Sequence, residues 1–460
     1  ITAAILALAF NYLTVTKVEN NRALVKEWLK SNGIKLDKAN VKLTDFKITY
    51  DQAEWDKLKN KLDNARYFDI LDEKYMKRQE NGFDPQYSKV LVDYWRTKYD
   101  WKKEIEQLNR YSQYKIVLND TNIHFVRAQI KPDGHKPGDT TIKVMLLDGW
   151  PGSFFGFYKL LDHLQASRNK NNLALDIVIP SIPGYGYSTP INRPVDSIDT
   201  ALLFDALMRH LHGEEVKYFL HGEDWGSVIS THLGTLFPER VRAAHLTMPP
   251  VARFNNIYYI VYSALATINP GWIMTPAELR MRQYFGFDKF GKFLKSTGYF
   301  HMQATTPDTL GHSMADSPVG LMAYVLEKYS RGSFDDYEVI GTIDGGLERF
   351  SKDELLTIIT YYWMTNSMTS SMRLYKNAVA SLYGSEAKGL VSSVKPLVPI
   401  GVQYFRNELM QMPEILLNKL FNLKKLKLET NGGHFAAFEN PVLTGNDFVE
   451  FIQLITKSSS

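Results

Sequence analysis

Three apolar runs in the middle of the chain each end in a turn rich in glycine and proline. Continuous apolar runs are typical of strands buried on both faces, as in a parallel sheet covered by helices. The pattern therefore predicts an α/β fold, with a mostly parallel sheet and helices on both faces, beginning near Thr140. The three runs are TIKVMLLDGWPGS, ALDIVIPSIPGYGYS and VKYFLHGEDWGSVIS.

Composition narrows the chemistry that this chain can perform. Of its 460 residues 44% are hydrophobic and 23% are charged, which excludes a disordered, collagen-like or polytopic membrane protein. Lys and Arg number 54 against 50 Asp and Glu, an excess too small to indicate nucleic-acid binding, so we expect a small-molecule partner. The absence of cysteine excludes a disulfide scaffold, a thiolate nucleophile and a Cys-bound zinc. Any nucleophile is therefore Ser, Thr, Lys, Asp or Glu.

The first 15 residues, ITAAILALAFNYLTV, are almost entirely apolar and are followed by basic residues. A bilayer-spanning helix needs about 20 residues, and because the chain begins at Ile1 rather than Met, we expect upstream residues to supply the missing turns. We interpret residues 1–20 as the remnant of a membrane anchor. An amphipathic helix packed on the body and a secretory signal are the alternatives.

The segments around the three apolar runs divide the chain further. Residues 43–113 carry apolar positions every three to four residues, which indicates amphipathic helices, and residues 116–130 are predicted to be short strands joined at Asn119 and Asp120. After about Pro250 the sequence is aromatic, Met-rich and helical up to about Ala380. We expect an N-terminal arm (21–139), the first part of the core (140–250), a helical lid (251–380) and the second part of the core (381–460).

The third run contains the spacing small–x–nucleophile–x–small at residues 222–226. A strand that turns sharply into a helix forces the central Asp224 into strained backbone angles, and we expect a Cβ at Gly222 or Gly226 to collide with it. A carboxylate needs no base at pH 7 and attacks a saturated carbon to give an ester, so the expected substrate is an alkyl electrophile. The plainer alternative makes Asp224 only a helix N-cap.

A second match to this spacing, residues 311–315, places Ser313 at the centre. We do not expect a nucleophile there, because the preceding TTPDTL is not an apolar strand and the following DSPVG is not expected to begin a helix.

Two backbone N–H groups are expected to stabilise an oxyanion next to Asp224. Trp150 lies in the loop after the strand KVMLL, and Trp225 is the first residue after the nucleophile. A Gly–Pro turn without a function is the alternative for the Trp150 loop.

A histidine and an acid follow the nucleophile in the order that this arrangement requires. His434, in the glycine loop NGGHF, is the expected general base, and Glu408, after the strand VPIGVQYF, is the acid expected to orient it. The other choices for the acid are Glu414, Glu429 and Asp344.

With these motifs the chain resembles the epoxide hydrolases of the α/β-hydrolase superfamily, specifically the microsomal branch and the insect juvenile hormone epoxide hydrolases. The resemblance implies an α/β-hydrolase fold with a helical lid insert and an N-terminal helical arm, no cofactor, no metal, and a membrane anchor in the endoplasmic reticulum. It also implies that two lid tyrosines, Tyr299 and Tyr375, hold the epoxide oxygen and donate protons to it. It covers most of the chain, through YWRTKYDW, GWPGS, IPGYGYS, GEDWGS, STGYFHMQATTPDTL, DSPVGLMAYVLEK and NGGHFAAFENP.

Two positions depart from the family pattern. The chain has Asp148 where the family usually has His, and Glu223 where it often has Gly. A carboxyl group at position 148 is expected either to repel Asp224 or to stay protonated with a raised pKa.

The expected reaction is hydrolysis of an epoxide to a vicinal diol through a hydroxyalkyl ester on Asp224, with water as the second reactant. Juvenile hormone is the expected substrate, together with other lipophilic epoxides. A haloalkane dehalogenase shares the nucleophile and base but uses halide-binding donors in place of the phenols. A catalytically silent hormone-binding protein is the alternative outside the enzymes, motivated by Asp148.

Overall fold

The computed structural model describes residues 23–34, 41–68, 77–188, 193–250, 257–282, 285–334, 341–384 and 386–458. The predicted anchor remnant, residues 1–20, lies outside them. Within these ranges no helix combines the length and the apolar character needed to cross a bilayer.

The described residues form a nine-stranded sheet in the order β1-β2-β3-β5-β4-β6-β7-β8-β9. Neighbouring strands from β5 to β9 are parallel, whereas β1, β2 and β3 extend the β5 edge as antiparallel strands. The predicted mostly parallel sheet is therefore confirmed. The strands are β1 (Leu43–Phe46), β2 (Ser112–Leu118), β3 (Thr121–Ile130), β4 (Ile142–Leu147), β5 (Leu175–Pro180), β6 (Tyr218–Gly222), β7 (Val241–Leu246), β8 (Pro399–Asn407) and β9 (Asn422–Gly433).

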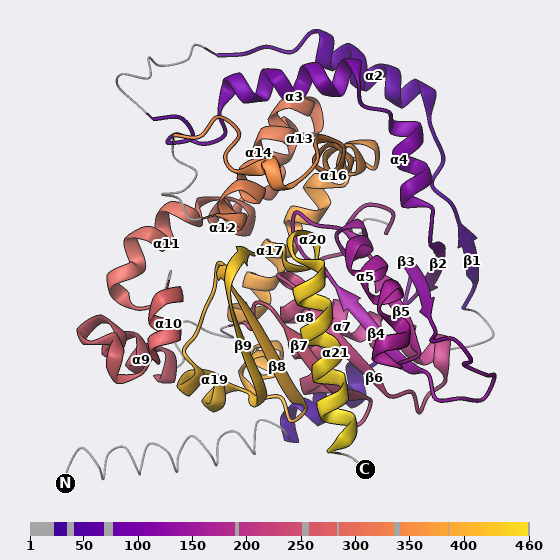
Figure 1. The fold of residues 1–460 in the computed structure, drawn as a ribbon, viewed down its shortest axis with the longest axis vertical. Coiled ribbons are helices and arrows are strands. Elements are labelled where there is room, and N and C mark those ends of the chain that lie inside the picture. Colours follow the sequence, from indigo (N-terminus) through magenta and orange to yellow (C-terminus); the bar gives the residue numbers. More distant parts are fainter. Residues whose placement is uncertain are drawn as a thin grey trace.

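Helices cover both faces of the sheet, as predicted. In Figure 1, α5 and α21 lie in front of the sheet and α7 and α8 lie behind it. Helices α12, α13, α14, α16 and α17 gather over one end of the sheet, between β7 and β8 in the chain (Figure 1). The helices are α2 (Gln52–Asp63), α3 (Pro85–Thr97), α4 (Trp101–Leu108), α5 (Tyr158–Ala166), α6 (Arg168–Asn171), α7 (Ser197–His212), α8 (Trp225–Leu236), α9 (Ile257–Ile268), α10 (Pro276–Met281), α11 (Phe290–Ser296), α12 (Gly298–Thr305), α13 (Pro307–Asp316), α14 (Pro318–Ser333), α16 (Lys352–Met364), α17 (Met368–Gly384), α18 (Glu386–Ser393), α19 (Glu414–Leu420), α20 (Ala436–Glu439) and α21 (Pro441–Lys457).

The N-terminal segment both extends the sheet and braces the helices above it. The predicted hairpin is confirmed: Asn119 and Asp120 join β2 to β3 with φ angles of 46° and 60°, as a tight two-residue turn requires. The predicted boundary at residue 140 falls between β3 and β4 of one sheet. Helix α3 packs on the lid, where the Tyr94 hydroxyl donates to Asp353 Oδ1 at 2.9 Å.

The prediction that DSPVG does not begin a helix is wrong, because α14 begins at Pro318. Ser317 accepts a hydrogen bond from the Gly320 N–H at 3.0 Å, and proline at the first helical position needs no hydrogen-bond acceptor. Ser313 nevertheless lies exposed inside α13 and not on a strand-to-helix turn, so the structure gives no support to a nucleophile there.

Candidate active site

Asp224 occupies the sharp turn between β6 and α8. Its φ of 48° and ψ of −123° lie in a region that residues with a Cβ rarely adopt, which agrees with the strain expected of an elbow. It occupies the N-cap position of α8, but its side chain accepts no capping hydrogen bond. The N-cap alternative therefore does not account for this residue.

The glycines of the elbow are needed for a different reason from the one predicted. A Cβ on Gly226 would lie 1.9 Å from the Leu147 carbonyl oxygen on β4, and a Cβ on Gly222 would lie 2.5 Å from the Gly226 carbonyl oxygen. The collisions are with β4 and with α8, and not with Asp224. The glycines thus allow the helix to begin against the sheet.

One carboxylate oxygen of Asp224 already lies against a predicted oxyanion donor. The Trp150 N–H donates to Asp224 Oδ1 at 2.8 Å. Trp225 is the first residue of α8, so its N–H has no acceptor within the helix. A Cβ on Gly149 would lie 2.0 Å from Asp224 Oδ1 and 2.5 Å from the Trp225 nitrogen, so the loop, the carboxylate and the helix N-terminus converge on one small space.

His434 lies between Asp224 and Glu408. Its Nε2 is 3.2 Å from Asp224 Oδ2, and its Nδ1 is 2.6 Å from Glu408 Oε1. Glu408 is fully buried and His434 is nearly so. Burial alone would lower the pKa of His434, but Glu408 and Asp224 raise it well above its ordinary value. The free site is therefore built to hold an imidazolium between two carboxylates.

The other candidate acids lie elsewhere. Glu414 begins α19, Glu429 Oε1 accepts a hydrogen bond from the side chain of Gln403 at 3.2 Å, and Asp344 accepts hydrogen bonds from the loop around Gly346. The structure brings only the predicted Glu408 of these four to His434.

The two lid tyrosines lie on α12 and α17 above the two tryptophans. The ring of Tyr299 stacks on Trp150 with centroids 5.6 Å apart, and the ring of Tyr375 packs edge-on against Trp225 at 4.9 Å. Among the residues that the structure describes, none accepts the proton of the buried Tyr375 hydroxyl. Burial, and then the charge of Asp224, raises the pKa of Tyr299, so this phenol keeps its proton at neutral pH.

The two positions that depart from the family pattern are both carboxyl groups near Asp224. Burial and the neighbouring Glu223 raise the pKa of Asp148 well above its ordinary value, which favours the protonated form that the sequence allowed for. Burial also raises the pKa of Glu223 to about 8. Sequence reasoning missed the contacts of Glu223. His221, near the end of β6, places Nε2 3.1 Å from Glu223 Oε1, and its Nδ1 contacts His245 Nδ1 on β7 at 2.8 Å.

Comparisons with known proteins agree with this arrangement. Residues 43–157 match the model of the epoxide hydrolase N terminus, and residues 143–296 match that of the alpha/beta hydrolase fold. Epoxide hydrolase 1 of Sus scrofa is 35% identical over 417 residues, which cover 89% of this chain and 88% of that protein. This chain belongs to the epoxide hydrolase family. Juvenile hormone epoxide hydrolase of Bombyx mori is 33% identical, with 93% of this chain and 90% of that protein covered.

Solved structures of epoxide hydrolases confirm the predicted α/β-hydrolase fold. The crystal structure of juvenile hormone epoxide hydrolase from the silkworm Bombyx mori superposes with a TM-score of 0.83 at 32% identity, covering 94% of this chain and 98% of that one. The Aspergillus niger epoxide hydrolase has the same fold, with a TM-score of 0.68 at 23% identity over 90% of this chain and 97% of that one. The family membership favours an epoxide-hydrolysing enzyme over a haloalkane dehalogenase or a silent binding protein.

Proposed function

We propose that this epoxide hydrolase acts through a covalent ester on Asp224, with His434 as base, Glu408 as the acid that orients it, and Tyr299 and Tyr375 as proton donors. One observation carries the proposal. A single carboxylate, on a strained turn, accepts a hydrogen bond from Trp150 N–H through Oδ1 and faces His434 Nε2 through Oδ2.

In the first step, Asp224 Oδ2 attacks the less hindered epoxide carbon from behind. The carbon–oxygen bond of the ring breaks as the ester bond forms, and a phenol of Tyr299 or Tyr375 gives its proton to the leaving oxygen. A positioned general acid contributes about 10² to 10⁴ in rate. The product of this step is a hydroxyalkyl ester and a phenolate. The phenolate then takes the proton of the His434 imidazolium, which restores the phenol and leaves His434 neutral.

In the second step, water attacks the ester carbonyl while His434 Nε2 takes its proton. The N–H groups of Trp150 and Trp225 hold the oxyanion, and removing one such donor typically costs about 3 to 4 kcal/mol of transition-state stabilisation. Collapse of the intermediate releases the diol and regenerates the Asp224 carboxylate. The imidazolium and the carboxylate of the free site are thereby restored, so the cycle consumes only epoxide and water.

Mass spectrometry of the His434→Gln protein tests these roles. Incubated with a terpenoid epoxide, this variant is expected to accumulate an adduct of substrate mass on the peptide that contains Asp224, because ester hydrolysis lacks its base. The matched control is the Asp224→Asn/His434→Gln protein, which should stay unmodified. An adduct on any other peptide, or none at all, would count against the assignment.

We propose a juvenile hormone, a terpenoid ester that carries an epoxide, as the physiological substrate. Support comes from relatives named juvenile hormone epoxide hydrolase, at 32–33% identity over most of this chain. The test compares kcat/KM for juvenile hormone with that for a short aliphatic epoxide. A preference for the short epoxide would contradict the proposal while leaving epoxide hydrolysis intact.

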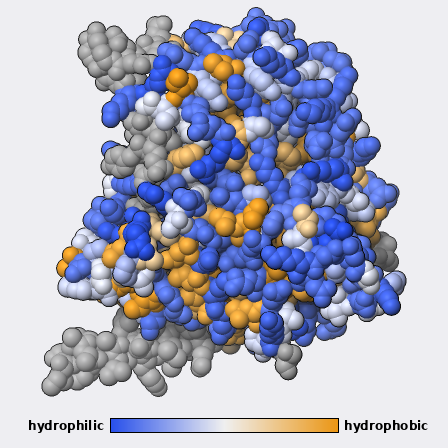
Figure 2. Space-filling view, in the orientation of Figure 1, coloured by the Kyte–Doolittle hydropathy of each residue, from blue (hydrophilic) through white to orange (hydrophobic). Residues whose placement is uncertain are grey.

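We further propose that the chain is associated with the endoplasmic reticulum membrane. Support comes from the apolar residues 1–15 and from α9, which buries Ser263 and Ala266 and exposes larger apolar side chains, including Ile268 at 70%. Figure 2 shows apolar residues at the surface on the corner of the molecule where α9 and α10 lie. Exposed apolar side chains beside basic residues, such as Phe290 and Leu294 beside the two lysines of α11, suit an anionic lipid surface.

Sedimentation with anionic phospholipid vesicles tests the membrane proposal. The Ile268→Asp/Trp272→Asp variant and a chain without residues 1–20 should each bind vesicles more weakly than the full chain. If neither change weakens binding, both parts of the membrane proposal are wrong.

A further inference from the structure

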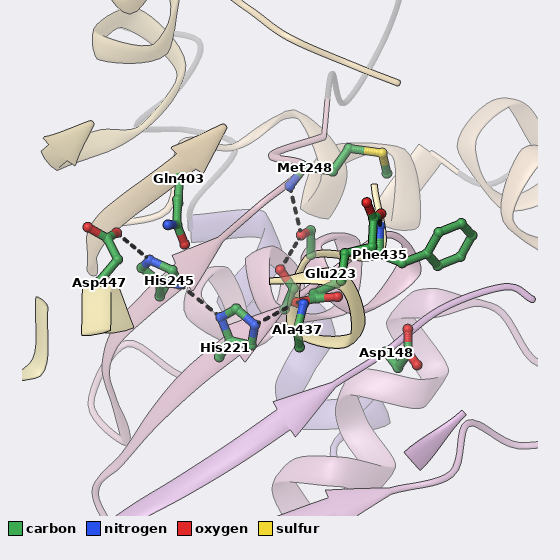
Figure 3. A network of polar contacts seen from close by, with 12 residues as sticks. Asp148, His221, Glu223, His245, Met248, Gln403, Phe435, Ala437 and Asp447 are labelled. Carbon is green, nitrogen blue, oxygen red and sulfur yellow. Dashed lines mark hydrogen bonds and ion pairs between the residues drawn. The ribbon is translucent and has the colours of Figure 1, made fainter. Parts of the chain in front are cut away.

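A buried chain of titratable side chains runs beneath the nucleophile, from α21 to the elbow. Asp447 Oδ2 lies 2.9 Å from His245 Nε2, His245 Nδ1 lies 2.8 Å from His221 Nδ1, and His221 Nε2 lies 3.1 Å from Glu223 Oε1. Figure 3 shows the two imidazoles side by side between the two carboxyl groups. The mechanism above uses none of these four side chains, although Glu223 is the neighbour of Asp224.

This hydrogen-bonded series of side chains joins the turn of the nucleophile to the loop of the base. Glu223 Oε1 also accepts a hydrogen bond from the Ala437 N–H at 2.8 Å, and Ala437 lies three residues after His434. Glu223 thus ties the turn that carries Asp224 to the segment that carries His434 (Figure 3). Loss of this link would leave the 3.2 Å approach of His434 to Asp224 less well defined.

The number of protons shared by the four side chains follows from the contacts between them. Each of the three contacts holds one proton, and the contact between two Nδ1 atoms requires that one ring be protonated there and the other not. Two neutral imidazoles supply two protons, so the third must come from a carboxyl group. The four groups together therefore carry one negative charge and not two.

The surroundings place that charge at Asp447. Lys425 Nζ lies 2.9 Å from Asp447 Oδ1, and 2.8 Å from the exposed Glu450. Burial lowers the pKa of His221 to about 3 and that of His245 to about 4, so neither ring is an imidazolium. The carboxyl groups and rings that face Glu223 include Asp148, Asp224, Glu408, His434 and Tyr329. Burial, Glu408 and Asp224 disfavour a carboxylate at 223, and together they outweigh the opposite effect of His434.

We propose that Glu223 is a positioning residue for ester hydrolysis. The hydrogen-bonded side chains of His221, His245 and Asp447 keep Glu223 as an uncharged acid. Glu223 in turn holds the loop of His434 to the turn of Asp224. His221 then carries its proton on Nδ1, His245 carries its proton on Nε2, and Glu223 donates to His221. This inference rests on the proposed roles of Asp224 and His434.

Nitrogen NMR of ¹⁵N-histidine-labelled protein tests the proton arrangement without substrate. His221 should be neutral with its proton on Nδ1 and His245 neutral with its proton on Nε2, the signals being assigned with His221→Gln and His245→Gln variants. A proton on His221 Nε2, or an imidazolium at either position, would overturn the proposal. This readout does not depend on whether Asp224 forms an ester.

Single-turnover kinetics test the positioning role. Glu223→Ala should slow ester hydrolysis about tenfold to hundredfold and leave ester formation unchanged, whereas Glu223→Gln, which keeps an uncharged donor and acceptor, should restore most of the rate. Glu429→Ala is the matched control, since Glu429 lies on β9 and accepts its hydrogen bond from Gln403, and it should hydrolyse the ester at the normal rate. A Gln variant as slow as the Ala variant, or an Ala variant as fast as the unmodified protein, would show that Glu223 has no such role. Failure of His434→Gln to form an ester would instead overturn the proposed function.

Discussion

Asp224 Oδ2 lies 3.2 Å from His434 Nε2, so the proposed nucleophile and the proposed base form an ion pair before substrate binds. The pKa of His434 is raised, against the effect of burial, by Glu408 and by Asp224 itself. In the proposed mechanism, ester formation removes the negative charge of Asp224, and the pKa of His434 then falls. The His434 imidazolium can therefore give its proton to the phenolate and become a base when the ester that it is proposed to hydrolyse has formed.

Substitution of Asp224 by Asn is expected to lower the pKa of His434, because the amide carries no charge to stabilise the imidazolium. The sign is fixed by the raised pKa: the imidazolium persists at higher pH in the unmodified protein than in the variant. The measurement is a pH titration of the His434 ring signals by NMR. Asp148→Asn is the control, since Asp148 does not contact His434, and it should change this pKa less. An unchanged titration in Asp224→Asn would contradict the ion pair.

Removal of one lid hydroxyl, in Tyr299→Phe or Tyr375→Phe, is expected to slow ester formation about tenfold to hundredfold, and the double variant should lose most of the 10² to 10⁴ available to a general acid. The remaining phenol explains the smaller single effects. Stopped-flow measurement of ester formation separates this step from hydrolysis. Tyr324→Phe is the control, because the Tyr324 ring also packs against Trp150 while its hydroxyl accepts a hydrogen bond from Gln303. Equal losses in all three single variants would point to packing and not to proton donation.

The sequence could predict that Asp224, His434 and Glu408 lie close together, because of how a parallel sheet is built. Each residue follows a predicted strand, and the carboxyl ends of parallel strands meet at one edge. The order nucleophile, acid, histidine favoured His434, and the strand VPIGVQYF directly before Glu408 favoured this acid over the others. Tyr299 and Tyr375 followed only from family resemblance, since helical packing of the lid decides which of 26 tyrosines face Asp224.

Features that depend on strand register were beyond sequence reasoning. His221 and His245 are paired across β6 and β7, and nothing in their spacing along the chain indicates that their rings meet. The collision of a Cβ on Gly226 with Leu147 likewise depends on how closely α8 approaches β4. The pairing of β3 with β5 places part of the N-terminal segment in the same sheet as the core, although the sequence divided this segment from the core as an N-terminal arm.

Asp205 is expected to be one of the residues on which stability depends most. Its fully buried carboxylate accepts hydrogen bonds from Arg240 Nε at 2.7 Å, Arg209 Nε at 2.9 Å and the Tyr218 hydroxyl at 3.1 Å. Asp205→Ala removes the buried carboxylate from two guanidinium groups, which keep only the exposed carboxylates of Glu214 and Glu239, and should lower the free energy of unfolding by up to about 3 to 5 kcal/mol.

Urea unfolding measures the effect of Asp205→Ala. Asp162→Ala is the matched control, because it removes an exposed ion pair with Arg110 and should cost less than about 1 kcal/mol. Comparable losses in the two variants would show that burial of the Asp205 pair has no special effect.

Gly226→Ala is expected to destabilise the fold and abolish ester formation together. Its Cβ would lie 1.9 Å from the Leu147 carbonyl oxygen, a backbone atom that cannot rotate away, so either α8 or β4 must move. Such overpacking costs about 1 to 3 kcal/mol or more, and the movement displaces Asp224 from Trp150 N–H.

Gly291→Ala, on α11 with open space around its Cβ, is the control. It should be neutral or more stable by up to about 1 kcal/mol, since alanine favours a helix. Thermal unfolding and single-turnover assays on both variants distinguish the cases. A Gly226→Ala protein of normal stability and activity would mean that the elbow tolerates a side chain, and that the close approach of α8 to β4 is not what positions the nucleophile.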